Sequence, residues 1–286
     1  MKVFGIDVSK WQGNFNFKKA KAEGVEFAII KAGGSDGGYY KDPKFERNYK
    51  EAKKQGLNVG AYYFCTLTSV NDAKNEAKHF IECIKGKQFE LPVYVDVEHK
   101  SSYSKSKKEL TDAIIEFCNI MEKNGYWVGI YMSKSKFSSE VDDTRLQNYA
   151  HWVAQWTKSC TYKPKSVLGM WQFGGETNKI RSNKVAGVVC DQNYMLVDYP
   201  TMIKEAGLNG FKKTPAKTET KTESKTEAKP TPAPAPKTII HTVKKGEYLI
   251  KIAKKYGVSW RKIAKDNKIK APFYIIKVGQ KLKINK

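Results

Sequence analysis

Eight short apolar segments recur along the first part of the chain, separated by amphipathic or polar stretches. The segments at 27–32, 59–64 and 127–132 are nearly continuous apolar runs, which is typical of strands that are buried on both faces. Each of these three follows a stretch with helical periodicity that ends in a glycine, where a left-handed residue can close a helix. The other five strand-like segments span 3–9, 91–98, 151–156, 168–173 and 187–193.

Helices are expected between these strands over 17–23, 43–55 and 110–124, and from Ser69, where Asp72 three positions on indicates a capped start. Alternating strands and helices predict an α/β fold with a parallel sheet, and eight strands in about 200 residues favour a (β/α) barrel. The gaps before the last three strands are too short, or too rich in glycine and lysine, for full helices. The expected fold is therefore an irregular barrel that lacks helices late in the chain.

The pattern changes after residue 210. Residues 212–237 are a near-repeat of Lys-Thr-Glu followed by alternating prolines, and they contain no apolar residue able to build a core, so we expect an extended linker over 211–237. Residues 238–286 show the order strand, helix, helix, strand, which predicts a very small α+β domain. The sequence thus predicts a large domain over 1–210, a linker over 211–237 and a small domain over 238–286.

The composition of the chain says little more about its fold, but it limits the kinds of partner that the chain can bind. No run of 18 apolar residues occurs, so no membrane-spanning segment is expected. The net charge is +23, and residues 238–286 hold 14 Lys and Arg against 2 Asp and Glu. This basic tail predicts a polyanionic partner, and charge alone leaves nucleic acid, an anionic membrane and an anionic cell wall open. The five scattered cysteines lack C-x-x-C spacing and are expected to be reduced thiols rather than zinc ligands.

Two carboxylates end the apolar segment at 91–98. Asp96 and Glu98 are two residues apart, which in a strand places both on one face with α-carbons about 6.6 Å apart. Repulsion between them would raise the proton affinity of one, so that it could act as a general acid while the other stays ionised. A metal site and a solvated loop start are the alternative interpretations of this pair.

Further candidate residues stand at the ends of other predicted strands. Asp7 ends the first strand and Asp191 lies in the eighth, and the strand ends of a parallel barrel meet at the face where active sites are built. Four acids around one mouth with aromatic walls are typical of sugar-cleaving enzymes, because carboxylates transfer protons and flat rings stack on sugars. Taken singly, Asp7 and Asp191 could belong to turns, and the aromatic residues to the core. The aromatic or amphipathic residues at these ends are Tyr62, Phe64, Tyr131, Trp156, Trp171 and Gln172.

Six short motifs follow one another along the large domain. They are Gly5-Ile6-Asp7-Val8-Ser9, Ile30-Lys31-Ala32-Gly33, Gly60-Ala61-Tyr62-Tyr63-Phe64, Leu91-Pro92-Val93-Tyr94-Val95-Asp96-Val97-Glu98, Trp171-Gln172-Phe173 and Asp191-Gln192-Asn193. In this order and spacing they resemble the glycoside hydrolase family 25 lysozymes, over about residues 1–205. The resemblance implies a flattened, irregular barrel and N-acetylmuramidase activity, which is hydrolysis of the β-1,4 bond from N-acetylmuramic acid to N-acetylglucosamine in peptidoglycan.

The resemblance also implies roles for single residues. Glu98 resembles the general acid/base, Asp96 the residue that orients the 2-acetamido group of the substrate, and Asp7 and Asp191 resemble supporting acids. The expected mechanism is substrate assistance, in which the acetamido carbonyl attacks the anomeric carbon; direct attack by a carboxylate would equally retain the anomeric configuration. No cofactor is expected. The implied substrate-binding residues are Lys31, Tyr62, Phe64, Tyr131, Trp156 and Gln172.

The chain departs from the family pattern at two places, and two rival functions stay open. Gly-Gly-Ser-Asp at 33–36 stands where relatives often have Thr-Glu-Gly, and Tyr63 stands where many have histidine. One rival is a non-catalytic wall-binding protein on a barrel scaffold, against which the intact Asp96 and Glu98 argue. The other is a chitinase-like glycosidase, whose motif would normally place another aspartate at Tyr94.

The tail carries motifs of its own. They are Val243-x-x-Gly246, Ile252-Ala253, Tyr256-Gly257-Val258-Ser259, Asn267, Ile269 and Gly279-Gln280-x-Leu282. They resemble the LysM module, a βααβ domain that binds glycans containing N-acetylglucosamine through the turn after its first strand and the loop before its last. Nucleic acid is disfavoured as a partner because the tail lacks a recognition-helix or RNA-sheet signature. The implied glycan-binding residues are Gly246, Glu247, Tyr248, Leu249, Ile250, Asn267 and Ile269.

The expected partner is therefore bacterial peptidoglycan, without stable insertion into a membrane. The first residues enter a strand pattern at once and lack the apolar segment and cleavage site of a signal peptide. We therefore expect synthesis in a bacterial cytoplasm and action on the cell wall after release, as for the endolysin of a phage or prophage. A bacterial autolysin is the alternative.

Overall fold

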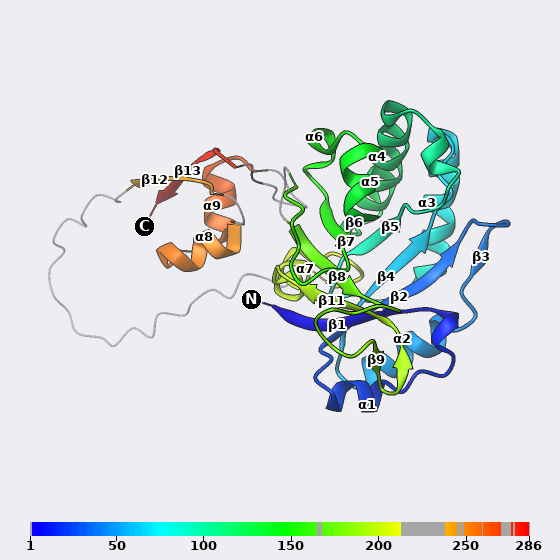
Figure 1. Cartoon of the computed structure of the whole chain (residues 1–286). Coiled ribbons are helices and arrows are strands. Elements are labelled where there is room, and N and C mark those ends of the chain that lie inside the picture. Colours follow the sequence, from blue (N-terminus) through cyan, green and yellow to red (C-terminus); the bar gives the residue numbers. More distant parts are fainter. Residues whose placement is uncertain are drawn as a thin grey trace, which may run out of the picture. The chain divides into compact units, whose positions relative to one another are not determined.

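The chain divides into two compact units, residues 1–212 and 213–286, which are described separately (Figure 1). The computed structural model describes residues 2–164, 168–212, 238–244, 247, 249–258, 260–269, 276 and 278–285. The expected linker over 211–237 lies outside the described residues except for its first two positions. No helix in the described parts of the chain is both long and apolar enough to cross a membrane.

The first unit is built on a closed barrel of eight strands, as predicted. Neighbouring strands pair in the order β1, β11, β8, β7, β6, β5, β4, β2, and the pairing of β1 with β2 closes the ring. The short β3 (Tyr40–Lys41) adds to β2 as an antiparallel hairpin outside the ring. The barrel strands are β1 (Val3–Val8), β2 (Phe27–Gly34), β4 (Asn58–Phe64), β5 (Val93–Asp96), β6 (Val128–Ser133), β7 (Ala150–Ala154), β8 (Leu168–Gly174) and β11 (Asp191–Met195).

The eighth strand differs from the prediction in direction and in bounds. The sequence predicted a parallel strand over 187–193, but β11 runs antiparallel to both of its neighbours and begins at Asp191. Residues 188–189 instead form β10 (Val188–Val189), which makes a hairpin with β9 (Lys184–Val185). Ala186 and Gly187, with φ of 54° and 85°, turn the chain between these two strands. The segment 187–193, which the sequence predicted to be one strand, therefore contains part of a turn, the strand β10 and the start of β11.

The helices cover the outside of the barrel (Figure 1). The four early helices lie where the sequence predicted them, but α4 begins earlier because Ser106 and Glu109 form a capping box ahead of it. After β6 the helices shorten to six and four residues, and the described residues between β7 and β8 contain none, as expected. The helices are α1 (Phe17–Ala22), α2 (Phe45–Lys54), α3 (Val70–Ile84), α4 (Lys107–Lys123), α5 (Lys134–Ser139) and α6 (Asp143–Leu146), with the 3₁₀ turns η1 (Lys10–Gln12) and η2 (Ser102–Ser104).

A further helix, α7 (Tyr199–Ala206), follows β11 and was not predicted. Its signals were present in the sequence, because Asp198 caps its start, Pro200 lies in its first turn and Gly207 ends it with a left-handed conformation.

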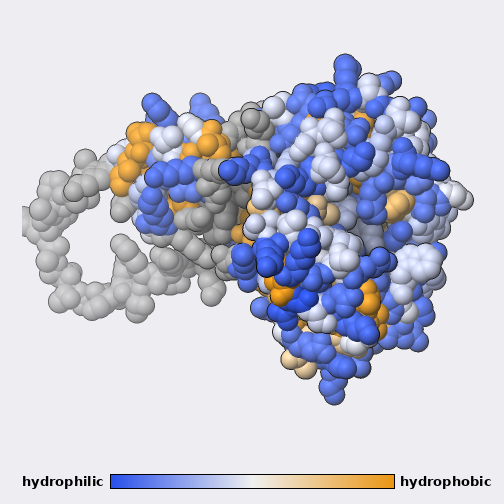
Figure 2. All heavy atoms as spheres, viewed as in Figure 1, coloured by the Kyte–Doolittle hydropathy of each residue, from blue (hydrophilic) through white to orange (hydrophobic). Residues whose placement is uncertain are grey.

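Aromatic side chains fill the barrel. The ring centroids of Tyr94 and Trp152 lie 5.0 Å apart, and a Cβ at Gly129 would come within 2.4 Å of the Tyr94 ring. Glycine at that position therefore lets β6 approach a large ring in the interior. Outside the barrel, Phe80 of α3 and Phe117 of α4 pack together under the two helices. The visible surface of this unit is mostly hydrophilic, with small separated apolar areas (Figure 2).

The second unit has the predicted strand, helix, helix, strand order. The two strands pair antiparallel with Thr238 opposite Asn285, and the helices lie between them in sequence. Ile252, Leu282 and Ile284 are among the residues that form its small buried core. Its elements are β12 (Thr238–Thr242), α8 (Leu249–Tyr256), α9 (Trp260–Asp266) and β13 (Lys281–Asn285).

Candidate active site

The structure brings the four candidate acids to one mouth of the barrel. Asp7 is the penultimate residue of β1, Asp96 ends β5, and Glu98 follows two residues later. Asp191 was predicted to reach this mouth near the end of a parallel strand. Instead it begins the antiparallel strand β11, where it pairs with Asp7. Burial raises the pKa of Tyr62, and the charges of Asp7, Asp96, Asp191 and Glu98 raise it further, so all four acids lie close enough to act on this side chain.

Two side-chain amides hold one carboxylate oxygen of Asp7. Its Oδ2 accepts from Nδ2 of Asn193 at 2.7 Å and from Nε2 of Gln172 at 3.1 Å, and the residue is only 7% exposed. Burial raises the pKa of Asp7 to about 6, although the two amide donors act to lower it. Burial, with the charges of Asp7 and Glu98, raises the pKa of Asp191 to about 8.

Gln172 on β8 connects the aromatic side of the site to the acids. Its Oε1 accepts from the Tyr131 hydroxyl at 3.1 Å and from Nε1 of Trp156 at 3.0 Å. Since an indole N–H can only donate, the oxygen of the amide must face Trp156, and Nε2 must face Asp7 and Asp191. The environment thus fixes the orientation of the amide without ambiguity.

Asp96 is the acid with unused hydrogen-bonding capacity. It is 3% exposed, and its Oδ1 has no hydrogen-bond partner among the described residues. Burial raises the pKa of Asp96 well above its ordinary value, repulsion from Glu98 raises it further, and the ammonium group of Lys31 opposes both. A buried carboxyl oxygen without a donor is costly for the fold, and this oxygen is therefore free to accept a hydrogen bond from a ligand.

Glu98 is exposed at the mouth, in contrast to Asp96. The pairing of β5 with β6 continues for one residue beyond Asp96, because the backbone N–H of Val97 donates to the carbonyl of Tyr131 at 3.0 Å. The Tyr103 hydroxyl donates to the Val97 carbonyl at 2.6 Å and so fixes the backbone just before Glu98. Loss of hydration raises the pKa of Glu98, and the charge of Lys31 lowers it.

Lys31 and the aromatic residues form the walls around these acids. The Lys31 side chain is buried, with Nζ 4.5 Å from the ring centroid of Phe64 and 5.6 Å from that of Tyr40. Tyr131 packs on Trp152 at 4.5 Å, and Tyr62 meets the same indole at 6.1 Å. Lys31, Tyr62, Phe64, Tyr131, Trp156 and Gln172 are thus gathered around the four acids, whereas Trp171 is buried in the core and donates to the Gln155 carbonyl.

Three residues at the site were missed by the sequence reasoning. Asn193 lies two residues after Asp191 on one strand, so period-two spacing could have assigned it to the same face. Gly175 gave no such signal, although a Cβ there would lie 1.9 Å from Oδ1 of Asp191 and 2.8 Å from the Trp156 ring. Tyr40 was also missed, because it reaches Lys31 only through the hairpin of β2 and β3.

Comparison with known proteins assigns the large unit. Residues 6–181 match the sequence model of glycosyl hydrolases family 25. The chain belongs to glycosyl hydrolase family 25. Lysozyme M1 of Streptomyces globisporus is 30% identical over 203 residues, which are 65% of this chain and 68% of that protein. Residues 241–285 match the LysM domain. Both predicted resemblances are confirmed.

Solved structures of family 25 proteins share this architecture. The CTP1L endolysin superposes with a TM-score of 0.60 and 27% identity, covering 72% of this chain and 70% of its own. The bacterial lysozyme of Streptomyces coelicolor superposes with a TM-score of 0.56 and 28% identity, covering 68% of this chain and 92% of its own. This family 25 chain is therefore a glycoside hydrolase of the lysozyme type with an appended LysM domain.

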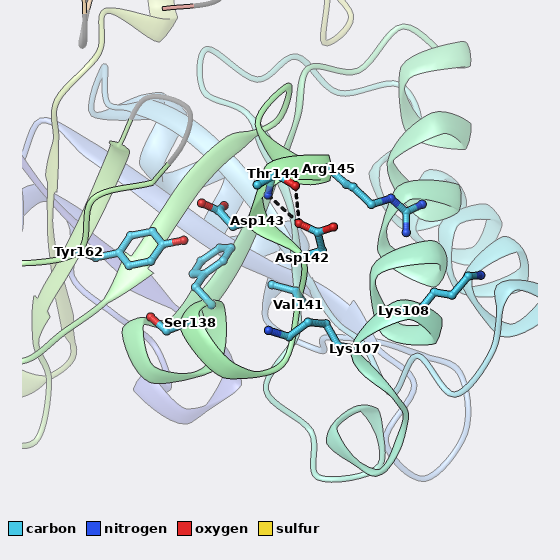
Figure 3. A pocket seen from close by; sticks show the side chains of 10 residues that line it. Lys107, Lys108, Ser138, Val141, Asp142, Asp143, Thr144, Arg145 and Tyr162 are labelled. Carbon is cyan, nitrogen blue, oxygen red and sulfur yellow. Dashed lines mark hydrogen bonds between the residues drawn. The ribbon is translucent and has the colours of Figure 1, made fainter.

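A cavity of about 560 Å³ lies elsewhere on the family 25 unit (Figure 3). It is lined by residues of α5, α6 and the start of α4, and none of the four acids of the barrel mouth lines it. Within it, the Asp142 carboxylate accepts from the backbone N–H of Thr144 at 3.0 Å and caps α6. The cavity is therefore separate from the barrel mouth.

The candidate glycan-binding residues of the LysM domain differ in burial and in the contacts that they make. Glu247 accepts from the backbone of Lys244 and contacts Nε2 of His241, both at 2.7 Å, and these interactions lower the pKa of Glu247 against the effect of burial. Leu249 is buried at the start of α8, and Ile269 is half-buried. Asn267 joins α9 to β13 through Nδ2 and Oδ1. Gly246, Tyr248 and the side chain of Ile250 lie outside the described residues.

Proposed function

We propose that this lysozyme-family peptidoglycan hydrolase cleaves the β-1,4 bond from N-acetylmuramic acid to N-acetylglucosamine, with retention of anomeric configuration. Glu98 acts as the general acid/base, and Asp96 holds the 2-acetamido group of the substrate. The observation that carries the proposal is the contrast between the two acids, because the buried Asp96 has an oxygen without a partner while Glu98 is exposed beside it.

Glu98 has the properties that a proton donor to the glycosidic oxygen needs. Its exposure lets the leaving sugar reach it, and loss of hydration raises its pKa, which is the direction that a general acid requires. After the leaving sugar departs, the resulting carboxylate can take a proton from the attacking water. The same group then serves as acid in the first step and as base in the second.

Asp96 is suited to positioning rather than to proton transfer to the leaving group. An acetamido N–H would satisfy its unpartnered Oδ1, and the carbonyl oxygen of the same group would then be turned toward the anomeric carbon. Attack by this oxygen inverts the anomeric carbon once and attack by water inverts it again, so the product retains the original configuration. Asp7 and Asp191, which both accept a hydrogen bond from Gln172, act as supporting acids of the pocket.

The second unit supports an attachment role. A LysM domain is present over 241–285, and we propose that it binds glycan chains of the same polymer and so holds the enzyme on its substrate. We also propose the bacterial cell wall as the place of action.

Digestion of purified peptidoglycan by wild type and by Glu98→Gln tests the catalytic proposal. The new reducing ends are reduced with borohydride and identified by mass spectrometry. Wild type is expected to release muramic acid ends, and Glu98→Gln is expected to lose at least about a thousandfold in rate because a required proton transfer is removed. Glu82, an exposed residue of α3 that pairs with Lys85, gives the control Glu82→Gln, which should keep the wild-type rate.

Glucosamine ends from wild type would make the chain a glucosaminidase. Absence of new ends from wild type would favour a wall-binding protein without catalysis, and inversion of the anomeric configuration would contradict both retaining routes.

A further inference from the structure

Trp11 is a large apolar side chain that is 78% exposed. It is the middle residue of η1, the 3₁₀ turn that directly follows β1 and Asp7 at the barrel mouth. Isolated exposed apolar residues are common on protein surfaces, so exposure alone indicates nothing. The surroundings of Trp11 distinguish it from such residues.

The backbone that carries Trp11 is fixed from several sides. Ser9 and Gln12 form a reciprocal capping box, in which the backbone N–H of Ser9 donates to Oε1 of Gln12 at 2.9 Å. The backbone N–H of Lys10 donates to the buried Asp42 carboxylate at 3.0 Å, which ties the turn to the hairpin of β3. The indole is therefore presented on a firm frame, and little conformational freedom of the backbone would be lost when a ligand stacks on it.

A continuous row of rings and ammonium groups leads from Trp11 to the acids. Nζ of Lys10 lies 5.0 Å from the Trp11 ring and 5.9 Å from the Tyr40 ring. Lys31 also lies beside Tyr40, with its Nζ 5.6 Å from the same ring. Lys31 in turn acts electrostatically on Asp96 and Glu98. The row thus begins at an exposed ring and ends at the catalytic carboxylates.

We propose that Trp11 and Lys10 form an outer subsite for the glycan chain, remote from the bond that is cleaved. The face of a pyranose ring stacks on the indole of Trp11, because the C–H groups of that face are apolar and the ring face is electron-rich. The Lys10 ammonium donates a hydrogen bond to a hydroxyl or carbonyl oxygen of the same sugar. The ligand is a further stretch of the β-1,4-linked amino-sugar chain, since the row leads into the site that cleaves it. The inference rests on the proposed function.

Cleavage of glycan strands of different length tests the subsite. Strands freed of stem peptides are separated into a long fraction and the shortest fraction that wild type cleaves, and kcat/KM is measured on each. For Trp11→Ala the ratio of kcat/KM on long strands to that on short strands is expected to fall about tenfold, which equals about 1.4 kcal/mol of lost binding. The loss should appear in KM, because the contact is remote from the reacting atoms. Trp11→Phe keeps a ring and should restore most of the ratio.

Val70 provides the matched control. It is another exposed apolar residue, at the start of α3, and Val70→Ala should keep the wild-type ratio. An unchanged ratio for Trp11→Ala, with wild type active on both fractions, would overturn the subsite and leave the proposed function intact. Failure of wild type to cleave either fraction would overturn both. Equal melting temperatures of the variants would exclude a folding defect as the cause of any loss.

Discussion

Single residues in this site derive their properties from burial and from a small number of amide donors. Gln172 shows this most clearly, because its two ends bind Trp156 and Tyr131 on one side and Asp7 and Asp191 on the other. The sequence identified the four acids, since acids that interrupt apolar strands have no reason in packing. It could not indicate which acid is buried without a partner, because that depends on the side chains that neighbouring strands contribute.

Asp7 makes the stability of the barrel depend on pH. Its pKa is about 6 in the folded protein against an ordinary 3.8, so the folded state binds its proton more tightly than the unfolded chain does. The contribution of Asp7 to the free energy of unfolding is therefore complete below pH 4 and is lost as pH rises to about 6. A shift of about two pKa units corresponds to roughly 3 kcal/mol.

Urea unfolding of wild type and Asp7→Asn at several pH values measures this contribution. The free energy of unfolding of wild type minus that of the variant is expected to fall by roughly 3 kcal/mol between pH 4 and pH 7. A difference that rises with pH would show that Asp7 is stabilised as the carboxylate instead.

At the level of elements, the loops at the mouth are held by a helix outside the barrel. Glu76 of α3 is fully buried, and its carboxylate accepts from the Ser35 hydroxyl, the backbone and hydroxyl of Thr66 and the backbone of Leu67. Leu67 has a φ of 28°, a conformation that L residues rarely adopt. The hydroxyls of Ser101 and Ser102, in the loop after Glu98, both donate to the Thr66 carbonyl. Glu76 therefore supports the loop after β4, and through it the loop after β5.

Replacement of Glu76 by glutamine should loosen this arrangement. The amide places an N–H₂ group against a backbone donor, which is expected to cost about 1–3 kcal/mol in the free energy of unfolding and to lower kcat. Urea unfolding and rates on soluble glycan strands measure both effects. Glu82→Gln, on an exposed position of the same helix, is the control. Equal stability of the two variants would contradict a supporting role.

The direction of β11 shows where sequence reasoning stops at this scale. Apolar runs and glycine-terminated helices predicted the early strands and helices well, because each is encoded within its own segment. The reversal of β11 is encoded instead by its pairing with β1 and β8, which lie far away in the chain. The short hairpin of β9 and β10, which precedes β11, contains residues that also suit a strand.

At the level of the whole molecule, catalysis and attachment belong to separate units. A chain ending at residue 212 should keep the wild-type rate on short soluble strands and lose about tenfold or more on insoluble walls, because tethering raises the local concentration of substrate. Clearing of a wall suspension and release of soluble ends measure the two activities. Added salt should narrow the difference, since the tail is strongly basic. A truncated chain as active on walls as the full one would show that the tail is dispensable.

The pairing of β1 with β11 determines when during its synthesis the chain can complete the barrel. Asp7 and its hydrogen-bond donor Asn193 are 186 residues apart in the sequence, and the ring of strands is complete only when β11 is in place. A nascent chain on the ribosome therefore carries Glu98 long before it has a working pocket. We therefore expect activity to arise only when β11 has been synthesised, and truncated chains that lack β11 to be inactive.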